Sequence, residues 1–164
     1  MAKPPYLLLV HNSFCDSTAR VQERGGGYSA AFLKQLEKMQ SAPHRAGDRY
    51  DCDGLPSCYA DFIYKCDIGG PRGPKVFYYI WNSQKLVIPF FVTPTARRDI
   101  DYASLEVEKH AAEIIDIVNG WPDTASDCEM WMISDGQLVR TNAGEYIARL
   151  LASRSVKSAR TGQS

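Results

Sequence analysis

Two arginines and a tyrosine follow an apolar run in this chain. The run KLVIPFFV is followed directly by TPTARRDIDY, which places Arg97, Arg98 and Tyr102 just beyond a buried strand. Guanidinium groups stay charged at any biological pH and present forked donors that fit phosphate oxygens. A tyrosine beside them can transfer a proton or stack on a nucleic-acid base. The alternative is a solvated helix start with acidic partners such as Asp99, although the helix macrodipole favours anions there.

A second group of basic residues surrounds the glycine-rich loop DIGGPRGP. Lys65, Arg72 and Lys75 form either an ordinary hairpin surface or a basic loop that holds a phosphate backbone. The strand KVFYYIW that follows could offer rings for RNA bases to stack on. Side-chain alternation puts Tyr78 and Tyr79 on opposite faces, however, so part of this aromatic group must belong to the core.

The cysteines and histidines show no ligand or disulfide pattern. The five cysteines are an odd number without a CxxC spacing, so we expect free thiols in a reducing cytosol. His110 reads as a surface histidine on a helix, with a general base as the alternative. A zinc site would need spacings outside the usual ligand patterns. The sequence therefore predicts neither a metal nor a cofactor.

Composition and charge describe a soluble globular protein. The chain has 164 residues, of which 45% are hydrophobic and 23% charged, which suits one domain or one domain with an appendage. Lys plus Arg and Asp plus Glu number 19 each, a balance that argues against a dedicated nucleic-acid binder. Residues 106–135 are acidic and residues 137–164 are basic. The first apolar run, of about five residues, is too short for a signal peptide or a membrane span, which predicts a cytoplasmic protein.

Periodicity predicts the elements that must position the basic residues. An apolar run predicts a first strand at residues 6–11, and helical spacing predicts helices at 28–40 and 100–118. Further predicted strands are residues 58–66, 75–81, 85–92 and 128–133, the second and third of these forming a hairpin. Asn142 and Glu145 have the spacing of an N-cap and its partner at the start of a last helix.

These elements predict an α+β fold. We expect a small antiparallel meander sheet of about four strands with helices packed on one face. We expect residues 1–120 to form this core and residues 121–164 to form a C-terminal extension with a short strand, a helix and a frayed tail.

Four segments, in order, resemble the RelE-type toxins of the RelE/ParE superfamily. They are FLKQLEKMQSAP, GLPSCY, KVFYYIWNSQKLVIPFFV and ARRDIDYASLEVEKHAAEII, and the similarity covers about residues 28–118. The resemblance implies metal-independent cleavage of ribosome-bound messenger RNA by attack of its own 2′-hydroxyl. It also implies a cognate antitoxin protein as partner, with no membrane and no small-molecule cofactor.

The resemblance also assigns roles to particular residues. Arg97 or Arg98 matches the family's arginine after the last strand, Tyr102 matches its tyrosine, and Lys75 matches the arginine that opens its strand. Independently of the resemblance, the basic residues Lys65 and Arg72 around the glycine-rich loop would bind RNA beside these positions.

The chain departs from the family pattern at two strand positions. Where the family has lysines after the GLPSCY turn, this chain has Ala60 and Phe62. This difference, together with the neutral charge, favours an alternative in which the same scaffold is a non-catalytic, protein-binding regulator. A gyrase-directed toxin is a third interpretation, because the superfamily includes such members.

Overall fold

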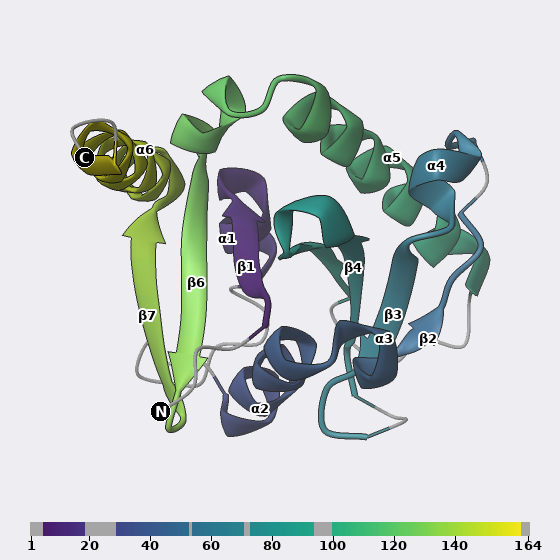
Figure 1. Cartoon of the computed structure of the whole chain (residues 1–164). Coiled ribbons are helices and arrows are strands. Elements are labelled where there is room, and N and C mark those ends of the chain that lie inside the picture. Colours follow the sequence, from purple (N-terminus) through teal and green to yellow (C-terminus); the bar gives the residue numbers. More distant parts are fainter. Residues whose placement is uncertain (1–4, 19–28, 53, 71–72, 94–99, 162–164) are drawn as a thin grey trace.

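A computed structural model of the chain describes residues 5–18, 29–52, 54–70, 73–93 and 100–161, and of residues 16–17, 100–106 and 154–161 it describes the backbone alone. Its centre is one seven-stranded sheet (Figure 1). The strands are β1 (Leu7–His11), β2 (Asp48–Arg49), β3 (Ile63–Asp67), β4 (Lys75–Trp81), β5 (Leu86–Val92), β6 (Cys128–Ser134) and β7 (Gln137–Asn142). The helices are α1 (Asn12–Ser17), α2 (Ala30–Ser41), α3 (Pro43–Ala46), α4 (Ser57–Ala60), α5 (Ile100–Asn119) and α6 (Ala143–Thr161), with 3₁₀ turns η2 (Asn82–Gln84) and η3 (Asp123–Asp127).

The α+β class is confirmed, but the small four-stranded meander is wrong. The strand order is β2-β3-β4-β5-β1-β6-β7, so β1 lies in the interior of a mixed sheet. Strand β1 pairs in parallel with β5 and antiparallel with β6. The β3-β4-β5 meander is present as predicted. The sheet is larger because β1 joins it to the β6-β7 hairpin, and because β2 adds an edge strand that is only two residues long.

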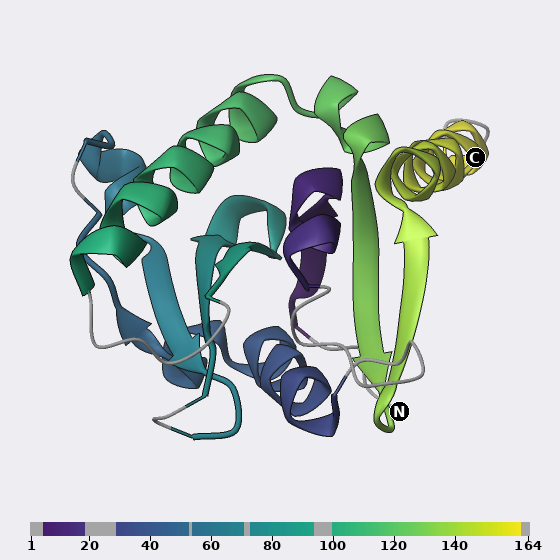
Figure 2. The ribbon, with the colours of Figure 1, turned by 180° about the vertical axis from the view of Figure 1, so that it is seen from behind.

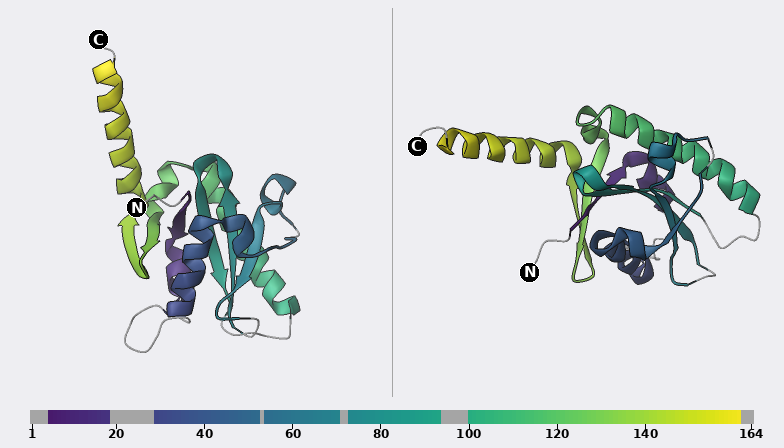
Figure 3. Two further views of the ribbon diagram at one scale, coloured as in Figure 1. Left: turned by 60° about the horizontal axis from the view of Figure 1, so that its bottom comes forward. Right: turned by 45° about the vertical axis from the view of Figure 1, so that its right-hand side comes forward.

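Helices cover both faces of the sheet, which corrects the prediction of helices on one face. Helices α1 and α2 pack against one face with the buried side chains of Phe14, Phe32 and Leu36. Helix α5 packs against the other face with Val107, Ala111 and Ile114. The two layers are visible on opposite sides of the sheet (Figures 2 and 3). All seven residues of β5 are buried, and a continuous apolar strand is typical of a sheet covered on both faces.

The predicted strand at residues 58–66 is only half strand. The segment begins as helix α4, in which the carbonyl of Pro56 accepts hydrogen bonds from the N–H groups of Tyr59 (2.9 Å) and Ala60 (3.0 Å). Strand β3 then begins at Ile63. A proline ahead of the segment favours this turn, because its fixed φ suits the start of a helix. Ala60 therefore lies in α4, and Phe62 lies in the turn that precedes β3.

The ends of the helices follow capping chemistry. Ser29 precedes α2, and its hydroxyl accepts a hydrogen bond from the N–H of Phe32 at 3.1 Å. The predicted cap of the last helix is confirmed, because Asn142 Oδ1 accepts from the N–H of Glu145 at 3.1 Å. Helix α6 is anchored at this end and then extends away from the rest of the molecule (Figure 3).

A buried glutamine ties α2 to the sheet where β1 begins. The last residue pair in the antiparallel ladder of β1 and β6 is Leu8 with Trp131. Two residues further along β6, the side chain of Gln40 forms hydrogen bonds with the backbone of Ile133. Gln40 Nε2 donates to the Ile133 carbonyl (3.1 Å), and the Ile133 N–H donates to Gln40 Oε1 (2.7 Å). The Gln40 carbonyl in turn accepts from the N–H of Tyr6 at 3.2 Å. The amide side chain therefore continues the ladder of β6 beyond the last residue pair.

Candidate functional site

Lys75 lies at the point where the chain leaves β5 toward the predicted arginines. Its N–H donates to Thr93 Oγ1 (2.8 Å), and its carbonyl accepts from the N–H of Thr93 (2.9 Å). Thr93 is the last described residue before the segment that carries Arg97 and Arg98, which lie outside the described residues. Arg72 also lies outside them, and Tyr102 belongs to the part of α5 described by its backbone alone.

Lys65 and Lys75 lie on the same face of the sheet, the one covered by α5. Lys75 is opposite Asp67 in the β3-β4 ladder and Lys65 is opposite Phe77, so the two lysines are diagonal neighbours. The Cβ atoms of diagonal neighbours lie on the order of 7 Å apart, a span that a single phosphate group can bridge with two long side chains. The structure thus places two of the predicted cations together, at the end of the sheet where residues 94–99 begin.

Each of these lysines has a partner within the chain. The Lys75 ammonium forms an ion pair with the Asp67 carboxylate, and both side chains are about one-third exposed. The Lys65 ammonium lies 5.6 Å from the ring centre of Tyr50, whose ring packs edge-on against Phe77. A phosphate that binds here would have to compete with Asp67 for Lys75, while Lys65 stays available above an aromatic ring.

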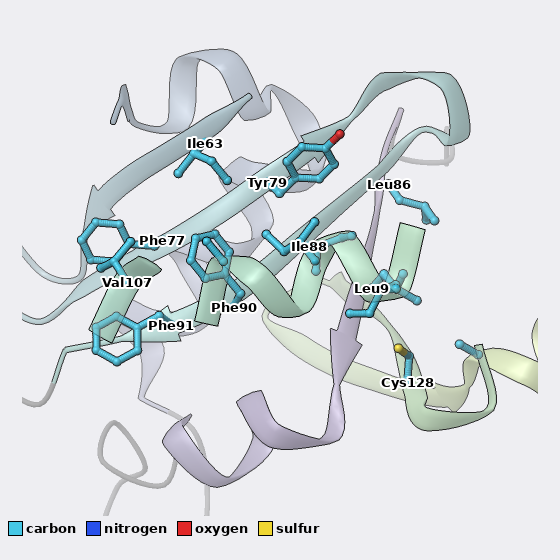
Figure 4. Packing of buried hydrophobic residues seen from close by; sticks show 14 of the residues in the cluster. Leu9, Ile63, Phe77, Tyr79, Leu86, Ile88, Phe90, Phe91, Val107 and Cys128 are labelled. Carbon is cyan, nitrogen blue, oxygen red and sulfur yellow. The ribbon is translucent and has the colours of Figure 1, made fainter. Parts of the chain in front are cut away.

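The sheet beneath this site is apolar and packs closely against α5. Val107 of α5 lies against Phe77 and Phe91 in the cluster shown in Figure 4. The ring of His110, one turn further along α5, stacks on Phe91 with ring centres 5.1 Å apart. Packing of this kind holds the end of the sheet and the helix in fixed relative positions, which is what a binding or catalytic site needs.

A second polar group borders the same cluster, and sequence reasoning did not find it. Ser13 Oγ donates to Glu113 Oε2 (2.9 Å) and lies 2.9 Å from His11 Nδ1. The N–H of Ser13 donates to the same nitrogen at 3.1 Å, which makes Nδ1 an acceptor when His11 is neutral. On the other side of the carboxylate, His110 Nδ1 lies 3.6 Å from Glu113 Oε1. Imidazole, hydroxyl and carboxylate groups in a row are suited to proton transfer.

Only part of this second group could have been found in the sequence. His110 and Glu113 are three residues apart on a helix, a spacing at which side chains meet. Ser13 lies close to Glu113 because β1 is an interior strand and the helix that follows it, α1, begins near α5. Local sequence patterns do not indicate that arrangement.

A third charged group holds the edge of the sheet. Arg140 of β7 forms two hydrogen bonds with the carboxylate of Glu129 (2.7 and 2.6 Å), and its guanidinium lies 5.3 Å from the ring centre of Trp131. These hydrogen bonds from Arg140 hold the pKa of Glu129 below its usual range. Cys15 Sγ lies 3.5 Å from the same carboxylate. The arrangement fastens β7 to β6, and we assign it a structural role.

The aromatic residues of β4 do not form a stacking platform. Tyr78 is fully buried and its hydroxyl donates to the carbonyl of Pro43 at 2.7 Å, while Tyr79 is buried on the opposite face. Burial raises the pKa of both phenols above the ordinary value. The interpretation of Tyr78 and Tyr79 as surfaces for RNA bases is therefore wrong, because the core on each side of the sheet encloses them. Trp81, at the end of the same strand, is half-buried, and its ring packs edge-on against Trp121.

The described residues contain no cluster of three or more His, Cys, Asp or Glu side chains that could hold a metal ion. No disulfide joins any two of the five cysteines, all of which belong to the described residues. Within the same described part of the chain, no helix has the length and apolar character needed to cross a membrane. Comparison of the chain with protein-family models, with curated proteins and with solved structures found no match.

Proposed function

We propose that this protein is a cytoplasmic toxin of a toxin–antitoxin pair and cleaves ribosome-bound messenger RNA. The observation that carries the proposal is the position of Lys75, hydrogen-bonded through its backbone to Thr93 at the start of the segment with Arg97 and Arg98. Lys65 lies diagonally beside it on the same face of the sheet. With Arg97 and Arg98, these cations would come from two strands and from the segment that follows a third, and together they would surround one phosphate group.

The proposed reaction is an attack of the RNA 2′-oxygen on the adjacent phosphorus. The new bond joins the 2′-oxygen to phosphorus while the bond to the 5′-oxygen breaks, leaving a cyclic phosphate and a 5′-hydroxyl. The attacking hydroxyl loses a proton to a base, and the leaving oxygen gains one from an acid. Arg97, Arg98 and Lys75 stabilise the charge on phosphate, Tyr102 assists proton transfer or stacking, and one well-placed donor contributes about 3–4 kcal/mol.

Primer extension on a translated messenger after brief induction tests the proposal. We expect new 5′ ends inside the coding region, lost in the Arg97→Ala/Arg98→Ala double variant and reduced about 100-fold or more by Lys75→Ala. Lys34→Ala is the matched control, because Lys34 is exposed on α2 at the opposite face of the sheet. Intact messenger with the unmodified protein would refute the nuclease, and DNA damage in its place would indicate a gyrase-directed toxin.

The ion pair gives a second test of the same site. Asp67→Asn removes the carboxylate that competes with phosphate for Lys75, so we expect tighter binding of RNA at low salt. The measurement is a salt titration of RNA affinity, with Lys75→Ala in the same background. If Asp67→Asn leaves affinity unchanged, Lys75 does not contact phosphate.

The second candidate is a non-catalytic regulator that binds another protein through this scaffold. The ion pair of Lys75 with Asp67 favours it, since the pair already neutralises a proposed catalytic cation. Growth arrest on expression that Arg97→Ala/Arg98→Ala relieves would favour the toxin, and unimpaired growth would favour the regulator.

If the protein is a toxin, its antitoxin is expected to cover the cationic face or to displace α5.

A further inference from the structure

Helix α6 and strand β7 carry all the large apolar side chains that remain exposed among the described residues. Val139 is 50% exposed, Leu150 is 38% exposed and Leu151 is 56% exposed. Single exposed apolar residues are ordinary, but Leu150 and Leu151 are adjacent on one helix, and exposed apolar residues gathered in one place mark an interaction surface. Figure 3 shows that α6 extends away from the sheet, whereas β7, which carries Val139, is the edge strand of the sheet.

The sheet and the helix form a corner at this place. Val139 is opposite Met132 in the β6-β7 ladder, which puts both on the sheet face that carries the buried Met130. The first turns of α6 pack into the cluster on that same face through Ala143 and Ile147. Helix α6 therefore projects from the sheet face on which Val139 is exposed. A second helix lying beside α6 would cover apolar side chains both on this sheet face and on α6.

Charge is separated along α6. At its base the exposed acidic residues are Glu145 on the helix and Asp123 and Asp127 on η3, which packs against α6. Toward its far end the helix carries only basic charges in its sequence. These basic residues are Arg149, Arg154, Lys157 and Arg160.

We propose that two copies of this chain pair through α6, with the two helices antiparallel about a two-fold axis near Leu151. A two-fold interface brings the same surface of both copies together, so it must be complementary to itself. Leu151 lies near the middle of α6 and would meet its symmetry mate. The basic end of each helix would then reach the acidic base of the other.

The same features argue against other occupants. A nucleic acid would match the basic end of α6 but not the exposed leucines or the acidic base. A different protein would need a basic surface opposite the acidic base of α6 and an acidic surface opposite its basic end. An antiparallel second copy of α6 has both.

Sedimentation equilibrium of the full chain at several protein and salt concentrations tests the pairing. We expect a concentration-dependent dimer that dissociates more readily as salt rises, because exposed charges contribute to it. Leu151→Asp is expected to raise the dimer dissociation constant by at least about tenfold. Ser153→Asp places the same charge on an exposed position about 200° around the helix from Leu151, and is expected to leave the constant nearly unchanged.

Exchanging charges between the acidic base and the basic end of α6 tests this interface specifically. Asp123→Lys with Asp127→Lys should weaken the dimer, and adding Lys157→Glu with Arg160→Glu should restore it. Circular dichroism of each variant establishes that it is folded. A chain that is monomeric at every concentration, a dimer insensitive to Leu151→Asp, or a failure of the exchange to restore pairing would each overturn the proposal.

Discussion

The buried amide of Gln40 gives the sharpest test of what ties α2 to the sheet. Gln40 is 1% exposed and exchanges two hydrogen bonds with the backbone of Ile133. In Gln40→Met the side chain keeps its length but can neither donate to nor accept from that backbone. Each buried backbone group left without a partner costs about 1–3 kcal/mol, so the variant should lose about 2–6 kcal/mol in free energy of unfolding. Domains of this kind have only about 5–15 kcal/mol in total.

Gln35→Met provides the matched control on the same helix. Gln35 Nε2 donates to the carbonyl of Ala46 at 3.0 Å, but the residue is only half-buried, so water can replace the lost bond. We expect a loss of about 1 kcal/mol or less for this variant. Urea unfolding followed by circular dichroism measures both variants, and an unchanged slope with denaturant would show that only stability has changed.

Gln40→Glu adds a dependence on pH. The neutral carboxylic acid can make both bonds to Ile133, whereas the carboxylate can only accept and is buried with its charge. Burial raises the pKa of such a group in the folded state, so the variant should approach the unmodified protein at acid pH and lose stability as pH rises toward neutrality. Equal losses in Gln40→Met and Gln35→Met, or a Gln40→Glu variant without this pH dependence, would refute the reasoning.

Three further predictions follow from protonation, capping and exposure. Burial raises the pKa of Cys66 and of Cys128 to about 12 and raises that of Tyr78 above its ordinary value. As pH rises, these groups therefore lose their protons in the unfolded chain before they do so in the folded protein. The free energy of unfolding should be unaffected below about pH 8 and should then fall by up to about 1.4 kcal/mol per pH unit for each group. If the pH dependence of the free energy of unfolding is the same in Cys66→Ala/Cys128→Ala, burial of these thiols is not its cause. Asn142→Ala should destabilise α6 by about 1 kcal/mol, measured by thermal unfolding, while Asn142→Asp should be nearly neutral. The exposed Cys58 should react with a thiol reagent in the folded protein, whereas Cys66 and Cys128 should react only on unfolding, as mass spectrometry of labelled peptides would show.

Much of the fold could be predicted because apolar periodicity is a local property. The strand at residues 6–11, the helix at 28–40, the 75–92 hairpin and the helix at 100–118 each correspond to an observed element. Strand β7 escaped prediction because its sequence, QLVRTN, is mostly polar at the edge of the sheet. Strand β2 escaped because it is too short to show a period.

The arrangement of the strands could not be predicted in the same way. Leu8 pairs with Val87 and with Trp131, partners far along the chain that no local pattern identifies. The same limit applies to the site. The register that puts Lys65 and Lys75 on one face follows from alternation, but Asp67 as partner of Lys75 depends on the length of the loop between β3 and β4. Ser13 reaches Glu113 only because of where β1 lies.

The interior position of β1 has a consequence for folding during synthesis. This strand is synthesised before both of its neighbours in the sheet, β5 and β6. Until β5 and β6 have been made, the apolar side chains of Leu8, Leu9 and Val10, which are fully buried in the folded protein, lack the neighbouring strands that bury them. Non-local pairing of this kind slows folding and prolongs exposure of apolar segments. The nascent chain therefore carries β1 unburied until β5 and β6 have been made, and the core cannot close before β6 has left the ribosome.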